Sequence, residues 1–484
     1  MWPAVYVETT TAPALETDAD TVVIGVVDGE PLHAEEAREQ LEALLDAGEA
    51  KSRFRHLALA HVAGRRVLLV GLGARDELDA ERARVAAAVA QRRARDLDAR
   101  TLCWALPPGA DDEIAEGLVH GTLLGAYRFD RYKRRAAADN GETGLQRLLI
   151  SAPRDVEAGV TRAVTVATAQ NRARDLGNRP PNDLTPTALG AYAAELAVAR
   201  DGLSVSVLGG DELRGLGMGL FAAVASGSAQ DPRLITLRYD GAPNTDRRLA
   251  LIGKAVTFDS GGLAIKSMAG MVDMKFDMAG GAAVIETMAA LADMAAPVNV
   301  LGVVGATENM ISGAAMRSGD ILTSLDGTTV EMNNADAEGR LVLGDCITYA
   351  RREGCDAIVD IATLTGGVVV ALGGVYAGLM ANDDTLAELV TACGERTGEL
   401  VWRLPLHPEY AEMIKSRYAQ ITNRSERREA SAITAAEFLH HFAGEVPWAH
   451  LDIAAVGDDG RKPYLDKGGT GFGVRLLTEL ALSF

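Results

Sequence analysis

The stretch Asn334–Leu341 places three charged side chains among small residues. Asp336, Glu338 and Arg340 alternate there with alanine and glycine. In an extended or irregular backbone, alternate side chains project to one side, so two carboxylates and a guanidinium would face one cleft. The apolar run that follows predicts a helix over 341–351, with the acidic residues at its N-terminus. Carboxylates are favoured at that end without any chemistry, so this stretch alone does not distinguish a capped helix from a functional site.

A second stretch carries charges in a setting that predicts burial. The segment 249–252 is predicted to be a buried strand, and Lys254, Asp259 and Lys266 follow it among glycines and small apolar residues. Asp277 lies in a similar setting further on. A lone buried Lys or Asp is costly unless it is paired or bound to a metal. Several carboxylates converging on divalent cations would account for all of these charges.

The spacing of these charges resembles the pattern of one family. That pattern has a Lys and an Asp five positions apart, a second Lys seven positions further, an Asp eighteen positions after the first Asp, and then the motif N-T-D-A-E-G-R-L. The chain therefore resembles the leucyl (cytosol) aminopeptidases, the two-metal peptidases of the M17 type. All seven functional positions match, and they are Lys254, Asp259, Lys266, Asp277, Asp336, Glu338 and Arg340. The resemblance extends from Asn178 to the last residue, whereas roughly the first 150 residues match only loosely.

The resemblance implies two divalent metal ions for each chain. Asp259 and Glu338 would touch both ions, Lys254 and Asp277 would complete one site, and Asp336 would complete the other. A lysine ligand must be neutral, and adjacent divalent charges lower its pKa. The set contains no histidine and is rich in oxygen ligands, and such sites accept several metals. Zn or Mn is expected, with Co or Mg as alternatives.

The resemblance also implies how the site would work. Two metal ions activate a water and hold the substrate carbonyl, and the free α-amine of the peptide would ligate one of them, which restricts cleavage to the N-terminal residue. Lys266 would polarise the scissile carbonyl, a role compatible with a salt bridge to a nearby carboxylate. Arg340 stays protonated and would hold a bicarbonate that acts as the general base, because a guanidinium fork suits that planar anion.

The side chain of the first substrate residue is expected to enter an apolar pocket. The positions that match the family's pocket wall are Met274, Thr363, Gly366 and Ala454, and the backbone of Thr363 and Leu364 would hold the peptide. A methionine and small residues suit Leu- or Met-like groups. For Met274, ordinary core packing remains an alternative.

The fold class is predicted to be α/β, because apolar runs typical of strands alternate with helical patterns. A smaller N-terminal α/β domain is expected over 1–153 and a linker helix with a Pro-rich link over 154–186. The larger C-terminal α/β catalytic domain, with a central mixed sheet, is expected over 187–484. Pro180 and Pro181 end the linker helix, and the charged segment 131–144 is predicted to be a surface loop. Two further local predictions are a hairpin of short strands around 326–327 and a glycine-rich turn over 215–219.

The charge and the cysteines restrict the class of protein. The net charge of −19 opposes long-range attraction to nucleic acid or anionic membranes, so neither is expected as a partner. The four cysteines form no C-x-x-C pair and predict reduced core thiols in a cytoplasmic protein. Neither a signal peptide nor a membrane span is expected. The resemblance implies a homo-hexamer that acts on peptides with a free N-terminus.

The chain departs from the family pattern in several places. Ala335 replaces a threonine, Ala279 a glycine and Gln420 an aspartate, and 424–429 replace a glycine-containing turn. Residues around the ligands tune metal sites, so two alternatives to a general aminopeptidase remain open. One is a specialised aminopeptidase that trims one precursor peptide in a biosynthetic pathway. The other is a non-catalytic metal-binding scaffold, which the intact Lys266 and Arg340 oppose.

Overall fold

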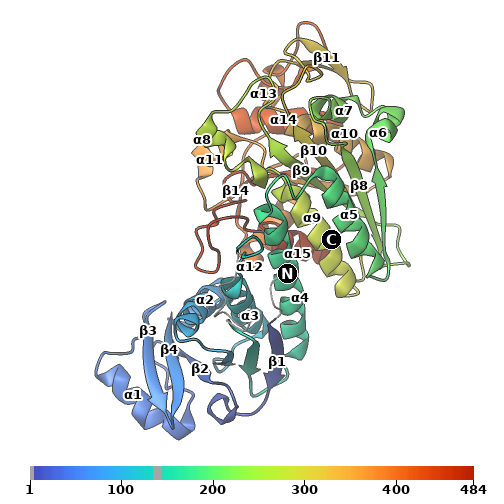
Figure 1. The fold of residues 1–484 in the computed structure, drawn as a ribbon. Coiled ribbons are helices and arrows are strands. Elements are labelled where there is room, and N and C mark those ends of the chain that lie inside the picture. Colours follow the sequence, from blue (N-terminus) through green and yellow to red (C-terminus); the bar gives the residue numbers. More distant parts are fainter. Residues whose placement is uncertain (1–4, 134–143) are drawn as a thin grey trace. The chain divides into compact units, whose positions relative to one another are not determined.

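The computed structural model describes residues 5–133 and 144–484. The chain divides into two compact units, Met1–Asn171 with Lys462–Asp466, and Arg172–Arg461 with Lys467–Phe484. Both units are α/β, as the sequence predicts (Figure 1). The division along the chain falls within α4 (Glu157–Asn178), the helix predicted as the linker. The surface loop predicted over 131–144 lies largely in 134–143, outside the described residues.

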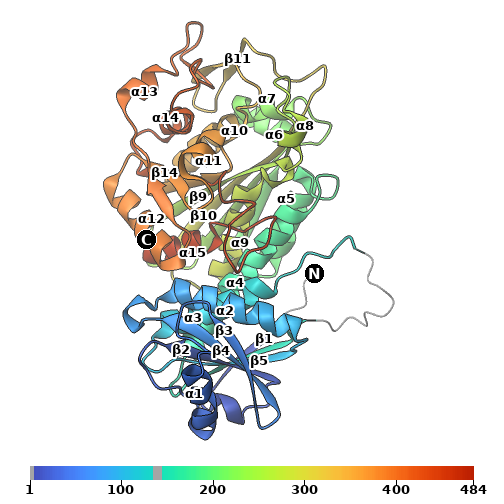
Figure 2. The ribbon, with the colours of Figure 1, turned by 90° about the vertical axis from the view of Figure 1, so that its left-hand side faces the viewer.

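The N-terminal unit contains a six-stranded sheet in the order β1-β6-β5-β2-β4-β3. Only the β3–β4 pair is antiparallel. Alternate residues of β2 enter different cores: Val23 packs with α2 and α3, whereas Val22 and Ile24 pack with α1 (Figure 2). The elements are β1 (Tyr6–Thr10), β2 (Thr21–Val27), α1 (Arg38–Asp46), β3 (Leu57–Val62), β4 (Arg65–Gly73), α2 (Ala80–Asp96), β5 (Thr101–Ala105), α3 (Asp112–Ala126) and β6 (Arg147–Ser151).

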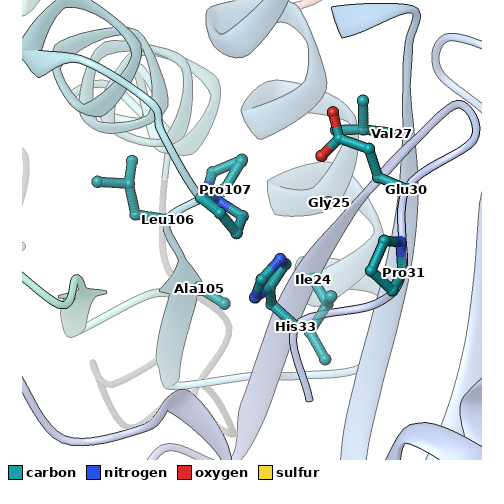
Figure 3. Close-up of a pocket in the computed structure, with 10 residues that line it drawn as sticks. Ile24, Gly25, Val27, Glu30, Pro31, His33, Ala105, Leu106 and Pro107 are labelled. Carbon is teal, nitrogen blue, oxygen red and sulfur yellow. The ribbon is translucent and has the colours of Figure 1, made fainter. Parts of the chain in front are cut away.

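A small crevice lies at the carboxyl ends of β2 and β5, where the strand order of this sheet reverses. Open α/β sheets bind ligands at such points. Ile24, Pro107 and His33 line the crevice, and Glu30 at its rim is paired with Arg75 (Figure 3). Its free volume of about 10 Å³ leaves room for about one water molecule.

The C-terminal unit is organised around an eight-stranded mixed sheet, in the order β15-β14-β17-β13-β9-β10-β8-β7. The central strands β17, β13, β9 and β10 are parallel to one another. The strands are β7 (Leu203–Leu208), β8 (Arg233–Asp240), β9 (Leu249–Asp259), β10 (Asn299–Asn309), β13 (Ala357–Ala362), β14 (Ala377–Ala381), β15 (Val401–Arg403) and β17 (Trp448–Asp452). A second sheet holds β11 (Asp320–Thr323), β12 (Thr329–Met332) and β16 (Ile421–Thr422), and its β11–β12 hairpin was predicted.

Helices cover both faces of the large sheet (Figure 1). One face carries α7 (Gly219–Ala225), α10 (Gly339–Arg352) and α14 (Ser431–Ala443), and the other carries α5 (Pro186–Val198), α9 (Ala279–Asp293) and α15 (Val474–Ser483). The remaining helices are α6 (Gly210–Leu216), α8 (Met268–Met271), α11 (Gly366–Leu372), α12 (Asp384–Thr397) and α13 (Pro408–Glu412). None of the helices in the described ranges has the length and apolar composition needed to cross a bilayer.

Two local predictions differ from the structure. The strand predicted to end at Ile252 continues to Asp259, because three of the four residues in 255–258 are apolar and the strand stays paired with β10 to its end. Lys254 therefore lies inside a strand and not after it. The glycine-rich turn predicted over 215–219 separates two short helices, α6 and α7, that the glycines obscure in the sequence.

Glycines at the start of α9 allow this helix to approach the sheet closely. A Cβ at Gly280 would lie 2.1 Å from the carbonyl oxygen of Ile361, and one at Gly281 would lie 2.6 Å from the Cβ of Ala255. The close approach brings Asp277, two residues before α9, near β9. The backbone N–H of Val256 donates to the Asp277 carbonyl at 3.2 Å.

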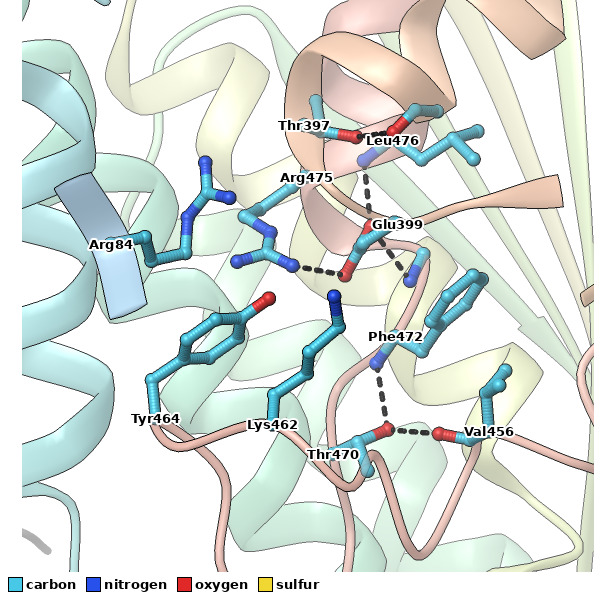
Figure 4. Close-up of polar contacts among 12 residues, drawn as sticks. Arg84, Thr397, Glu399, Val456, Lys462, Tyr464, Thr470, Phe472, Arg475 and Leu476 are labelled. Carbon is cyan, nitrogen blue, oxygen red and sulfur yellow. Dashed lines mark hydrogen bonds and ion pairs between the residues drawn. The ribbon is translucent and has the colours of Figure 1, made fainter. Parts of the chain in front are cut away.

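The buried carboxylate of Glu399 fixes the start of α15. One of its oxygens accepts the backbone N–H groups of Gly473 at 3.0 Å and Leu476 at 2.9 Å (Figure 4). The neighbouring hydroxyl of Thr470 donates to the carbonyl of Val456 at 2.8 Å. These contacts hold the segment that follows β17.

Candidate active site

A cavity of about 250 Å³ lies beside the carboxyl ends of β9, β13 and β17. Its position agrees with the rule that open α/β sheets bind ligands at this edge. Its walls bring together segments that are far apart in the sequence. The lining residues include Lys254, Asp259, Lys266, Met274, Asp277, Asp336, Glu338, Thr363, Leu364, Gly366 and Ala454.

Lys254 enters the cavity from the middle of β9. Its ammonium lies 2.8 Å from Oδ1 of Asp277 and 2.8 Å from Oε1 of Glu338. It also donates to the carbonyl oxygen of Thr363 at 3.1 Å. The residue is 2% exposed, so the two carboxylates compensate a charge that could not otherwise be buried.

Asp259 is the last residue of β9 and is held by a turn and a neighbouring strand. Its Oδ1 accepts the backbone N–H of Gly261 and the side-chain amide of Asn309, both at 2.8 Å. Gly261 has φ +85°, a conformation that favours glycine. The other oxygen, Oδ2, lies 2.8 Å from the ammonium of Lys266, which also pairs with Asp336.

Asp336 and Glu338 come from the loop before α10, and Glu338 immediately precedes the helix. Asp259, Asp336 and Glu338 each offer an oxygen within 4.8 Å of the others. Alternate side chains along 334–341 were predicted to project to one side. This alternation ends at Glu338, because α10 begins at the next residue. Arg340, in the first turn of α10, is accordingly not among the described residues that line the cavity.

Burial is the largest influence on the pKa of each of the four carboxylates. Burial, reinforced by Glu338, raises the pKa of Asp259 to about 6. Burial also raises the pKa of Asp277 and of Asp336 above the usual range. For Glu338, burial is outweighed by Lys254 and Lys266, so its pKa is lowered. Four carboxylates thus share two ammonium groups, and the excess negative charge suits added cations.

Divalent metal ions fit the residues of this cavity. Carboxylate oxygens are ligands that divalent cations accept, and three are already within reach of one point. Oδ2 of Asp277 is buried and, among the described residues, has no hydrogen-bond partner. The pKa of Lys254 is raised because its carboxylate neighbours outweigh burial. Its nitrogen can become a ligand only by releasing a proton.

Arg340 is buried against the loop that carries Asn423. Its Nη1 donates to the carbonyl oxygen of Asn423 at 2.9 Å, and its Nε has no partner among the described residues. Burial lowers the pKa of Arg340 to about 10, so the group remains a cation at neutral pH with a donor to spare.

The five residues predicted for substrate binding all line the cavity. The backbone groups of two of them already have partners within the chain. The carbonyl oxygen of Thr363 accepts from Lys254, and the N–H of Leu364 donates to Asp452 at 3.1 Å. The hydroxyl of Thr363 donates to Asp277 Oδ1 at 2.8 Å.

Sequence reasoning missed two polar residues that support the site. Asn309 donates both to Asp259 and to the carbonyl of Ala335, at 2.8 and 2.9 Å. Asp452 accepts four hydrogen bonds from segments of the cavity wall. Each ends a central parallel strand, as Asp259 does. A search for polar residues at strand ends would therefore have found them.

Comparison with known proteins identifies relatives over both units. Residues 171–478 match the catalytic domain of the cytosol aminopeptidase family, and residues 23–136 match its N-terminal domain. A "Probable cytosol aminopeptidase" of Roseiflexus castenholzii is 43% identical over 487 residues, 98% of each chain.

Two solved structures share the fold. The "Bottromycin maturation enzyme BotP in complex with Mn" is 38% identical, with a TM-score of 0.86, over 96% of this chain and 99% of that chain. A mutant of tomato leucine aminopeptidase is 31% identical, with a TM-score of 0.88, over 100% of this chain and 97% of that one. This agreement over both units and the acidic cavity lead to one conclusion: the chain belongs to the cytosol aminopeptidase family, M17, and is a metal-dependent aminopeptidase.

Proposed function

We propose that the chain removes Leu- or Met-like residues from the N-terminus of peptides with two divalent ions per subunit. One observation carries the proposal: two lysines and the four carboxylates that they pair with come from distant segments and line a single cavity. Lys254, Asp259, Asp277, Asp336 and Glu338 would hold the ions. When bound, the ions supply Lewis-acid polarisation of the carbonyl and activation of a water.

The chain's own residues would orient the peptide and stabilise charge. The ammonium of Lys266 lies in the cavity and would donate to the oxygen of the scissile carbonyl as negative charge develops there. The apolar side chain of the first residue would pack against Met274 and Ala454. Gly366 leaves space in the same wall, because a Cβ there would meet no atom of the described residues within 4 Å.

Arg340 would hold a bicarbonate as general base. Its buried Nε without a described partner supports this role, because it leaves a donor that an anion could use beside the bond from Nη1 to Asn423. Removal of carbonate from the buffer should lower the rate, and added bicarbonate should restore it. An Arg340→Ala variant that responds to bicarbonate as the parent does would contradict the assignment.

Zn or Mn is proposed as the native metal, with Co or Mg as alternatives. The similarity to BotP, whose solved structure is a complex with Mn, supports Mn, and the donor set is rich in oxygen.

We further propose a homo-hexamer in the cytoplasm. The relatives named cytosol aminopeptidase and the four buried free cysteines support that location. A light-scattering mass near that of one 50.9 kDa chain would refute the hexamer.

A specialised role in peptide maturation is the second candidate. The similarity to the bottromycin maturation enzyme favours it, as do Ala335, Ala279 and Gln420, which depart from the family pattern. A substrate panel distinguishes the candidates. A general enzyme should hydrolyse Leu- and Met-anilides and many dipeptides, whereas a specialised enzyme should prefer one longer peptide.

Metal exchange tests the main proposal. The chelated protein should be inactive on Leu- and Met-anilides, and added Mn, Co or Zn should restore hydrolysis with close to two ions bound per chain. Full activity after complete chelation would refute the metal-dependent mechanism. Metal binding without hydrolysis of any peptide would favour the scaffold.

A further inference from the structure

We propose that Asp452 is a positioning residue for substrate binding, which holds the turn 363–366 and Ala454 in the wall of the cavity. The inference rests on the proposed function, because it assigns that wall to the substrate. Asp452 has 0% exposure and is the last residue of β17. It does not line the cavity itself but contacts segments that do.

The register of the sheet brings Asp452 to this turn. β17 and β13 are parallel neighbours, and Asp452 pairs with Ala362, the last residue of β13. The chain leaves β13 at that point, and its next residues form the turn. Their backbone N–H groups are therefore free of the sheet and need another acceptor.

The carboxylate of Asp452 supplies that acceptor. Oδ1 receives the N–H groups of Leu364 at 3.1 Å and Thr365 at 3.3 Å, and also that of Ala454 at 3.3 Å. Leu364, Thr365 and Ala454 all line the cavity. One buried group thus joins two segments of the wall that are far apart in the sequence.

The second oxygen of Asp452 orients the hydroxyl of Thr365. That hydroxyl donates to Oδ2 at 2.6 Å and accepts the N–H of Val368 at 3.2 Å, which caps α11. A carboxylate only accepts, so it fixes the direction of the hydroxyl proton. An asparagine would place an NH2 donor either against the backbone N–H groups or against the hydroxyl of Thr365, and either arrangement loses hydrogen bonds that the carboxylate accepts.

The same turn reaches the proposed metal ligands. Thr363 accepts from Lys254 through its carbonyl and donates to Asp277 through its hydroxyl. Asp452 therefore sets the distance between the wall that binds the first residue and the charged groups that act on its carbonyl. A displaced wall would bind the first residue less tightly, so the loss should appear mainly in KM.

The test compares Asp452→Asn with a pair of changes at its partner, Thr365→Val and Thr365→Ser. Asp452→Asn and Thr365→Val should raise KM for Leu-anilide about tenfold or more with a smaller change in kcat, as loss of uniform binding does. Thr365→Ser retains the hydroxyl and should keep the parent KM within about threefold. Metal content should stay at the parent value in all three.

A buried carboxylate away from the cavity provides the control. Asp345 also has 0% exposure and accepts the N–H groups of Phe221 and Leu325, at 3.0 and 2.8 Å. Asp345→Asn should change thermal stability but leave KM unaltered. An equal rise of KM in this variant would show that Asp452 acts only through general stability.

A readout that needs no turnover separates this inference from the proposed function. Binding of L-leucine to the Mn-loaded protein, measured by calorimetry, should weaken in Asp452→Asn and Thr365→Val but not in Thr365→Ser. A parent that binds leucine but hydrolyses nothing would refute the proposed function alone. Parent-like KM and leucine affinity in Asp452→Asn, or identical values for the two Thr365 variants, would refute the positioning role. If Asp452→Asn does not fold, the Thr365 pair decides.

Discussion

The ammonium of Lys254 lies 2.8 Å from Oε1 of Glu338. Lys254 belongs to the middle of β9 and Glu338 directly precedes α10, so the contact joins the sheet to the start of the helix in the lining of the cavity. Both side chains are nearly fully buried, and a buried charge is stable there only beside an opposite charge or a metal ion.

Removal of either type of proposed ligand should abolish turnover. We expect Lys254→Ala and Asp336→Asn to lose hydrolysis of Leu-anilide in the presence of Mn or Co, because each removes a donor to an ion. Lys415→Ala, at an exposed lysine paired with Glu412, should retain the parent rate. Parent-like rates in either ligand variant would remove the metal assignment.

Lys266→Ala should separate catalysis from metal binding. The change removes a donor to the developing charge on the carbonyl oxygen, so kcat should fall on the order of 10²- to 10³-fold. Metal content, measured by mass spectrometry of the purified protein, should stay near that of the parent. A loss of metal equal to the loss of rate would instead make Lys266 part of the metal site.

Gly339→Ala should disturb the site although it favours the helix. Alanine stabilises a helix by about 1 kcal/mol relative to glycine, but a Cβ at Gly339 would lie 2.6 Å from the ammonium of Lys254. We expect weaker metal binding and a lower rate. Gly215→Ala in α6 is the matched control, because a Cβ there would meet nothing within 4 Å in the described part of the chain, and it should leave both properties unchanged.

The stability of the protein should depend on pH through Asp345. Burial raises the pKa of Asp345 to about 7, although backbone N–H groups act against this. Between about pH 4, where the unfolded group titrates, and about pH 7, the folded state holds a proton that the unfolded state has released. The contribution of Asp345 to stability is therefore present below pH 4 and is lost as the pH rises to 7.

An Asp345→Asn variant isolates this contribution. The difference in free energy of unfolding, parent minus variant, should fall on the order of 1 kcal/mol per pH unit between pH 5 and 7 and level off above that. Denaturation midpoints in urea measured at each pH provide the difference. A difference that does not vary with pH would mean that the carboxyl is ionised in the folded state over the whole range.

The α/β class and most elements of both units could be predicted from hydrophobic periodicity. The helix predicted over 341–351 and the hairpin β11–β12 illustrate this. The end of β9 could not be predicted in this way. The strand continues through Lys254, and a charged residue inside an apolar run normally indicates that a strand has ended. Only its pairing with β10 and its ion pairs with Asp277 and Glu338 make that continuation stable.

The candidate site was predictable to the extent that its residues lie in short segments of fixed spacing. Asn309 and Asp452 were not, because each is an isolated polar residue at the end of an apolar strand. Their partners, Asp259 and Thr365, are distant in the sequence, and only strand register relates them.

The sequence by itself determined the class of fold, the family and the set of charged residues available for chemistry, because periodicity and spacing are properties of neighbouring residues. The tertiary structure alone decided which charges meet. Parallel strands align their carboxyl ends at one edge of the sheet, and there the low dielectric of the interior forces each carboxylate to find a cation or a donor.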